Sequence, residues 1–161
     1  MPRAGGRGYP ERKSEEALMT IPEINYWAVL VATVASMIVG AIWYARAVLG
    51  ARWARLAGVD LDRPSRGPLW PMITTVIVSF ITAWVLAGAS SIAWHFYEGS
   101  YFWASVVTAV MLWAGFTAAR LITHDAFEGR PTALTTLNIA HELVTILVMA
   151  AIIGVWPPVG V

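Results

Sequence analysis

Apolar residues fill four long stretches of the chain, and short polar connectors separate them. The stretches cover about residues 24–49, 69–94, 101–123 and 132–156. Each is longer than the roughly 20 residues that a helix needs to cross the hydrocarbon layer of a membrane. None alternates apolar and polar residues, as the strands of a membrane barrel do. The pattern therefore predicts an all-α fold, an integral membrane four-helix transmembrane bundle.

Composition separates this bundle from a soluble one. Hydrophobic residues make up 58% of the chain and charged residues only 13%, whereas a soluble domain carries about 25% charge. Four apolar helices would leave a soluble protein no amphipathic shell to cover them. We therefore expect a single transmembrane domain over residues 21–161, with membrane lipid around it. Residues 1–20 are rich in Gly, Arg and Glu and predict a mobile polar tail.

A basic connector, residues 46–67, follows the first apolar stretch. Its apolar residues recur at helical spacing: Val48, Leu49, Trp53 and Leu56. This spacing predicts either a short amphipathic interfacial helix along the membrane surface or a first span that runs on past the lipid. The sequence leaves both alternatives open.

Arginine is concentrated in and beside the connectors that follow the first and third stretches, which share one side of a four-span protein. Seven arginines lie there: Arg46, Arg52, Arg55, Arg63, Arg66, Arg120 and Arg130. The connector between the second and third stretches has no Arg or Lys, and neither do the residues after the fourth. Basic connectors stay in the cytoplasm, so both termini are predicted to lie outside.

Small residues form a smooth stripe on the first span. Ala32, Ser36 and Gly40 are spaced four apart, so they share one face of a helix on which another helix can pack closely. The stripe predicts either a contact between subunits or a contact between spans of one bundle.

The fourth span carries the best candidate site. Its polar residues recur every three or four positions: Thr135, Asn138, His141, Glu142 and Thr145. His141 and Glu142 lie roughly 14 Å into the span at 1.5 Å per residue, which predicts a depth near the middle of the membrane. A carboxylate there needs a partner. We expect an ion pair between Arg120, near the end of the third span, and Glu142.

This intramembrane polar cluster has two interpretations. It forms a path or binding site for a proton, an ion or a small ligand, or it is a structural polar contact that fixes helix register. The chain has no cysteine, and its histidines, His95, His124 and His141, fall on different levels of the bundle, so no metal site and no cofactor are expected. No catalytic or phosphate-binding motif is present, which predicts a non-enzyme. The net charge of +1 offers no field for nucleic acid.

Two groups of residues carry a family resemblance. The first is Asn25-Tyr26-Trp27 with Gly40-Ala41-Ile42-Trp43-Tyr44, and the second is residues 127–131 followed by Asn138, His141 and Gly154-Val155-Trp156. Together they resemble a bacterial membrane family known as domain of unknown function 1761, over about residues 24–156. One departure is Ala45-Arg46, where the family often has Ser-Pro. The resemblance implies four membrane helices in a bacterial cytoplasmic membrane and no assigned activity.

The expected function follows from these features. A small chain with striped spans and short connectors is typical of a membrane module that acts as a homo-oligomer or as an accessory subunit of a membrane complex. The alternative is a small transporter or channel built around Asn138, His141 and Glu142. A third possibility, a membrane enzyme acting on a lipid or a quinone, has no motif in its favour.

Overall fold

The computed structural model describes residues 22–62 and 69–161. Along the chain it has helices α1 (Tyr26–Trp43), η1 (Arg46–Gly50), α2 (Ala51–Ala57), α3 (Leu69–Tyr97), α4 (Tyr101–Leu112), η2 (Trp113–Ala118), α5 (Ala119–Phe127) and α6 (Thr132–Val155). The two η segments are π-helical, and α4, η2 and α5 follow one another directly as one long helix. The predicted tail, residues 1–20, lies outside the described residues.

The predicted all-α fold is confirmed. Among the described residues, four helices are long and apolar enough to cross a membrane, and no strand occurs. They are Tyr26–Trp43, Leu69–Tyr97, Tyr101–Phe127 and Thr132–Val155. The first is shorter than the apolar stretch that predicted it, and the third continues four residues further, to Phe127.

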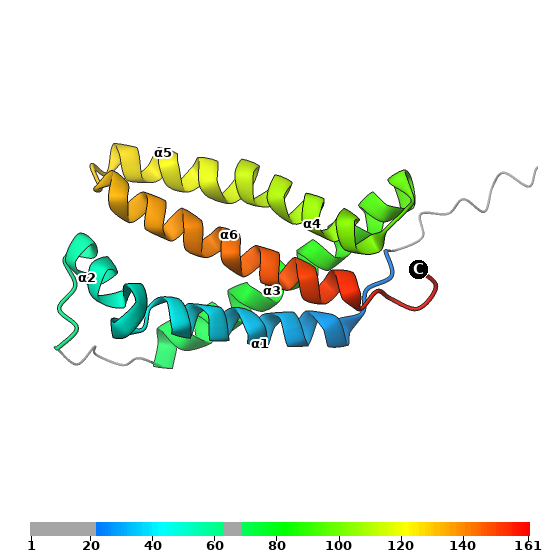
Figure 1. Ribbon diagram of the computed structural model, residues 1–161, viewed down its shortest axis with the longest axis horizontal. Helices are drawn as coiled ribbons and strands as arrows, with labels where there is room; N and C mark the ends of the chain where they lie inside the picture. Colours follow the sequence, from blue (N-terminus) through cyan, green and yellow to red (C-terminus); the bar gives the residue numbers. More distant parts are fainter. Residues whose placement is uncertain (1–21, 63–68) are drawn as a thin grey trace, which may run out of the picture.

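The four helices form a bundle in which each packs against two neighbours. Helix α6 contacts α1 and α4, and α3 contacts the same two helices (Figure 1). The core between them is built from alanines and larger aliphatic side chains, among which Val29, Leu86, Met149 and Ile153 are almost fully buried. Alanines such as Ala32, Ala83 and Ala150 let the helices approach closely.

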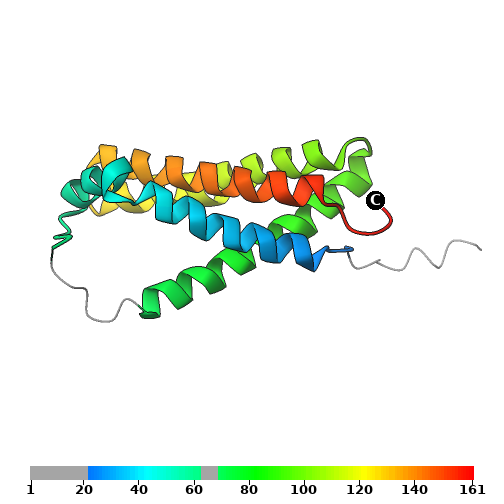
Figure 2. The same cartoon turned by 60° about the horizontal axis from the view of Figure 1, so that its bottom comes forward.

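Helix α3 leaves the bundle over its first half. Residues 69–78 are all exposed, whereas the second half buries Ala83, Leu86 and Ala87. In Figure 2 the start of α3 stands apart from the other three long helices, while its end lies among them. The bundle is therefore closed at the end of α3 and open at its beginning.

A sharp break ends α1 and begins a separate short helix. Tyr44 and Ala45 interrupt the helix, and the amide of Gly50 donates to the carbonyl of Ala45 at 3.0 Å. Arg46 holds the chain after α2, because its guanidinium donates to the carbonyl of Leu61 and pairs with Asp62, both at 2.7 Å. This break excludes one of the two alternatives for the connector, the one in which the first span runs on past the lipid.

The α5–α6 hairpin is held by a buried carboxylate. Asp125, only 5% exposed, accepts a hydrogen bond of 2.6 Å from the hydroxyl of Thr135, ten residues later. Arg130 lies 3.8 Å from the same carboxylate and 2.6 Å from Glu128. Gly129, at φ +67°, allows the chain to turn between these charges. The contacts fix the register of α6 against α5.

Replacing Thr135 with valine is expected to lower the stability of the hairpin by about 1.5 kcal/mol, because the buried carboxylate of Asp125 loses its closest donor. Thermal unfolding in detergent measures the loss. Thr136→Val is the matched control, because Thr136 is exposed and its hydroxyl donates only to the carbonyl of Thr132 in its own helix. Equal effects of the two substitutions would show that the Asp125 contact adds nothing.

Candidate functional site

The polar residues of α6 meet the last turn of α1. The ring of His141 lies 4.9 Å from the ring of Tyr44 and 5.7 Å from the indole of Trp43, measured between centroids. Gly40 faces this ring, since a β-carbon there would lie at the ordinary contact distance of 3.7 Å from His141 Nε2. We call Trp43, Tyr44, Asn138, His141, Glu142 and Thr145 the α1–α6 polar cluster.

Both ring nitrogens of His141 have polar neighbours on their own helix. Nδ1 lies 3.4 Å from a carboxylate oxygen of Glu142, and Nε2 lies 3.4 Å from the hydroxyl of Thr145. The imidazole is 13% exposed and the Glu142 side chain 46%. Burial, and after it the negative charge of Glu142, raise the pKa of the Tyr44 phenol, which directly follows the spanning part of α1. Tyr44 is therefore a hydrogen-bond donor at neutral pH.

The position of the cluster along α1 differs from its position along α6. Counting residues from the start of α6 placed His141 near the middle of a span. The structure sets it against Trp43, the final residue of the 18-residue helix α1. At 1.5 Å per residue α1 is about 27 Å long, close to the thickness of the hydrocarbon layer. The cluster therefore lies at the end of α1, beside an aromatic pair typical of an interface.

The expected ion pair between Arg120 and Glu142 is absent. Both residues are described, and the carboxylate of Glu142 meets His141 instead. Arg120 is exposed on α5. The sequence placed the two on neighbouring helices at similar levels but gave no information on which way each side chain faces. The structure thus brings together Asn138, His141, Glu142 and Thr145, and leaves Arg120 out.

Two polar atoms of the cluster are shielded and have no hydrogen-bond partner in the described part of the chain. They are Nε1 of Trp43 and Oδ1 of Asn138. A nearby indole behaves differently, because Nε1 of Trp113 donates to the carbonyl of Ile139 at 3.1 Å. The cluster therefore contains the neighbouring side chains of His141 and Glu142, together with one hydrogen-bond donor and one acceptor that have no partner.

The small-residue stripe lies inside the bundle. Ala32 is 0% and Ser36 5% exposed, and Gly40 faces His141. Ala32 belongs to the core shared with α3 and α6. In the described part of the chain the stripe is therefore covered by other spans of the same bundle, which leaves it no open face for a second subunit.

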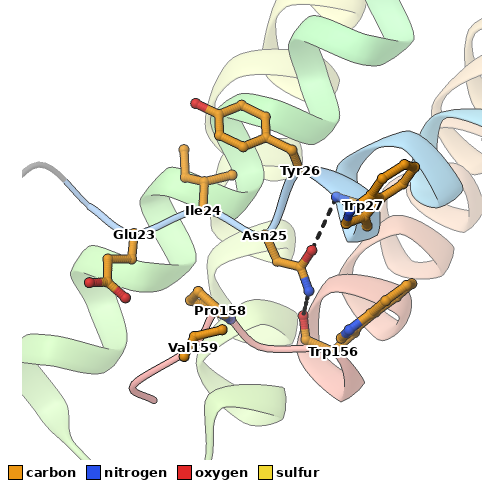
Figure 3. A pocket seen from close by; sticks show the side chains of 8 residues that line it. All are labelled: Glu23, Ile24, Asn25, Tyr26, Trp27, Trp156, Pro158 and Val159. Atoms are coloured by element: carbon orange, nitrogen blue, oxygen red, sulfur yellow. Dashed lines mark hydrogen bonds between the residues drawn. The ribbon is translucent and has the colours of Figure 1, made fainter.

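At the opposite end of the bundle, Asn25 joins the start of α1 to the end of α6. Its side-chain oxygen accepts from the amides of Trp27 and Ala28, and its nitrogen donates to the carbonyls of Trp156 and Pro157. Figure 3 shows this contact beside an open pocket of about 570 Å³. Sequence reasoning missed the role of Asn25, although an Asn directly before a helix is typical of an N-cap.

The pocket in Figure 3 is mostly apolar, with Trp27 and Trp156 on its walls. A second open pocket, of about 470 Å³, lies between Arg46 and Arg55 at the α2 end. Neither pocket reaches the α1–α6 polar cluster. The described residues also contain no group of three side chains able to hold a metal ion. The side chains of the cluster can exchange protons and form hydrogen bonds. They pack against aromatic rings, and neither of the two pockets opens onto them.

The fold and this cluster define a small helical protein with four apolar helices, compatible with a multi-pass membrane protein. Residues 27–154 match the family described as "Protein of unknown function (DUF1761)", so the chain belongs to that family. No curated protein and no solved structure matches the chain. The match covers Trp43, Asn138 and His141, which carried the resemblance in the sequence and meet in the cluster.

Proposed function

We propose that this protein is a non-catalytic membrane module that works by associating with further copies of itself. The supporting observation is the first half of α3, where residues 69–78 are all exposed. In lipid, helices associate through close van der Waals packing rather than through the hydrophobic effect. A half-helix that its own bundle leaves free is a surface for such packing.

The shape of this surface favours a symmetric contact. Thr74 and Thr75 hold their hydroxyls on their own helix, donating to the carbonyls of Trp70 and Pro71, so no polar group needs a partner. What remains outside is a ridge of branched side chains, with Ile77 53% exposed. In a two-fold dimer the same ridge meets itself. The first halves of α3 from two copies would then fill each other's open side.

The proposal also covers which membrane contains the protein and which end of the bundle faces the cytoplasm. The family resemblance supports a bacterial cytoplasmic membrane. The structure brings α2 and the α5–α6 connector to one end of the bundle (Figure 1), so Arg52, Arg55 and Arg130 share that end. Basic connectors are retained in the cytoplasm. We therefore place this end inside and both termini outside.

Cysteine crosslinking in native membranes tests the association, and the chain has no cysteine of its own. Ile77→Cys is expected to give a product of twice the chain's mass on oxidation. Val34→Cys on α1 is the matched control, because Val34 is 61% exposed but lies on a helix whose packing face is already covered. It is expected to stay monomeric at the same expression level.

Two outcomes would contradict self-association. One is the absence of any crosslink from cysteines at positions 73, 76 and 77, together with a monomer in native mass spectrometry. The other is a crosslinked product of a different mass, which would assign the surface to another membrane protein and make the chain an accessory subunit.

A further inference from the structure

The two unpartnered atoms of the α1–α6 polar cluster belong to residues that neighbour the same side chain, His141. Asn138 precedes His141 by three residues, so both lie on one face of α6. Trp43 contacts the His141 ring from α1. One atom is a donor, the indole Nε1–H, and the other is an acceptor, the amide Oδ1, and both are shielded from the surface. A shielded polar group without a partner is rare in a folded protein and calls for a cause.

The chemistry of the two atoms determines which group could form hydrogen bonds with both of them. The indole can only donate and the amide oxygen can only accept. A metal ion cannot accept the indole proton, and a carboxylate has no proton to give to Asn138. A hydroxyl oxygen does both at once. We propose that the α1–α6 polar cluster binds one hydroxyl group between Nε1 of Trp43 and Oδ1 of Asn138.

Water and the hydroxyl of a lipid headgroup share this chemistry. The cluster lies at the end of the spanning part of α1, where both are present. Tyr44 and the half-exposed Glu142 form the side that faces outward. A buried water commonly makes about three hydrogen bonds to polar groups that have no other partner. The His141 ring lies next to the proposed site. This site does not depend on the association proposed above.

The indole proton of Trp43 reports the bond directly in ¹H–¹⁵N spectra, and Trp43→Phe assigns its signal. Trp113 is the internal reference for a hydrogen-bonded indole. In dodecylphosphocholine, which has no hydroxyl, the Trp43 proton is expected to show the downfield shift and slow solvent exchange of Trp113. Asn138→Leu is expected to move the Trp43 signal, because both side chains bond one oxygen.

Two arms separate the sources of the hydroxyl. If the Trp43 signal is hydrogen-bonded in dodecylphosphocholine without added lipid, the hydroxyl is that of water. If the hydrogen-bonded signal forms only when phosphatidylglycerol is added, the hydroxyl belongs to the lipid headgroup. Ser90→Ala is the control, since Ser90 on α3 also carries a buried, unpartnered oxygen and should leave Trp43 unchanged. Cross-relaxation between the Trp43 indole proton and water or headgroup protons is measured on the unaltered chain, so a variant is needed only to assign the signal. A Trp43 proton without cross-relaxation, at the position of a free indole in both media, would overturn the proposal.

Discussion

Gly50→Ala lowers the free energy of unfolding by about 3 kcal/mol or more, the largest loss expected for any single methyl group in this protein. A β-carbon at Gly50 would lie 2.1 Å from the carbonyl oxygen of Tyr44, and 2.8 Å from its carbon. Both are backbone atoms, so no side chain can move aside. The break between α1 and α2 must open, and its hydrogen bond from Gly50 to Ala45 is lost with it.

Thermal unfolding in detergent measures this effect as a fall of about 10 °C in melting temperature. Gly115→Ala is the matched control, because a β-carbon at Gly115 meets nothing within 4 Å. It should be neutral or slightly stabilising, as alanine is the better helix former. Equal melting temperatures for the two variants would contradict the tight turn at Gly50.

Gly154→Ala is expected to cost about 2–3 kcal/mol by forcing α4 and α6 apart. Its β-carbon would lie 2.9 Å from Cα of Phe102 and 3.3 Å from the Phe102 carbonyl oxygen. Because the obstacle is again backbone, one helix has to shift. The contact lies close to the Asn25 connection, so the variant should also loosen the end of α6.

Gly88→Ala provides the comparison on another span. A β-carbon there would meet only Cδ1 of Ile24, at the ordinary distance of 3.6 Å. Melting curves and amide exchange of residues 150–156 should change for Gly154→Ala and stay the same for Gly88→Ala. Unchanged exchange in both would show that α4 and α6 are less closely packed than the structure indicates.

Hydropathy was sufficient to predict which segments become long helices, because their length and composition allow no other structure in lipid. It could not predict where α1 ends. Apart from Arg46 the stretch stays apolar through Val48 and Leu49, and the break depends on Gly50 packing against the carbonyl of Tyr44. That contact is between backbone atoms, and a hydrophobic pattern contains no information on it.

The candidate site was predicted in part. Helical spacing correctly gathered Asn138, His141 and Thr145 on one face of α6. The partner was wrong, because spacing along one helix does not say which neighbour faces it. In the sequence Trp43 and Tyr44 carried the family resemblance, and the structure places their rings against His141.

The buried carboxylate of Asp125 was also outside the reach of pattern analysis. Its neighbour His124 is exposed, and the adjacent pair suggests nothing but a surface turn. Only the hairpin geometry brings Thr135 within 2.6 Å. Charged residues near helix ends therefore need a structure before their roles can be assigned.

Because α3 diverges from the bundle, the cross-section of the protein differs between the two leaflets of a bilayer. On the side where α3 ends, four helices displace lipid together as one body. On the side where it begins, the first turns of α3 stand separately, and in a single copy acyl chains can lie beside them until a second copy covers this surface.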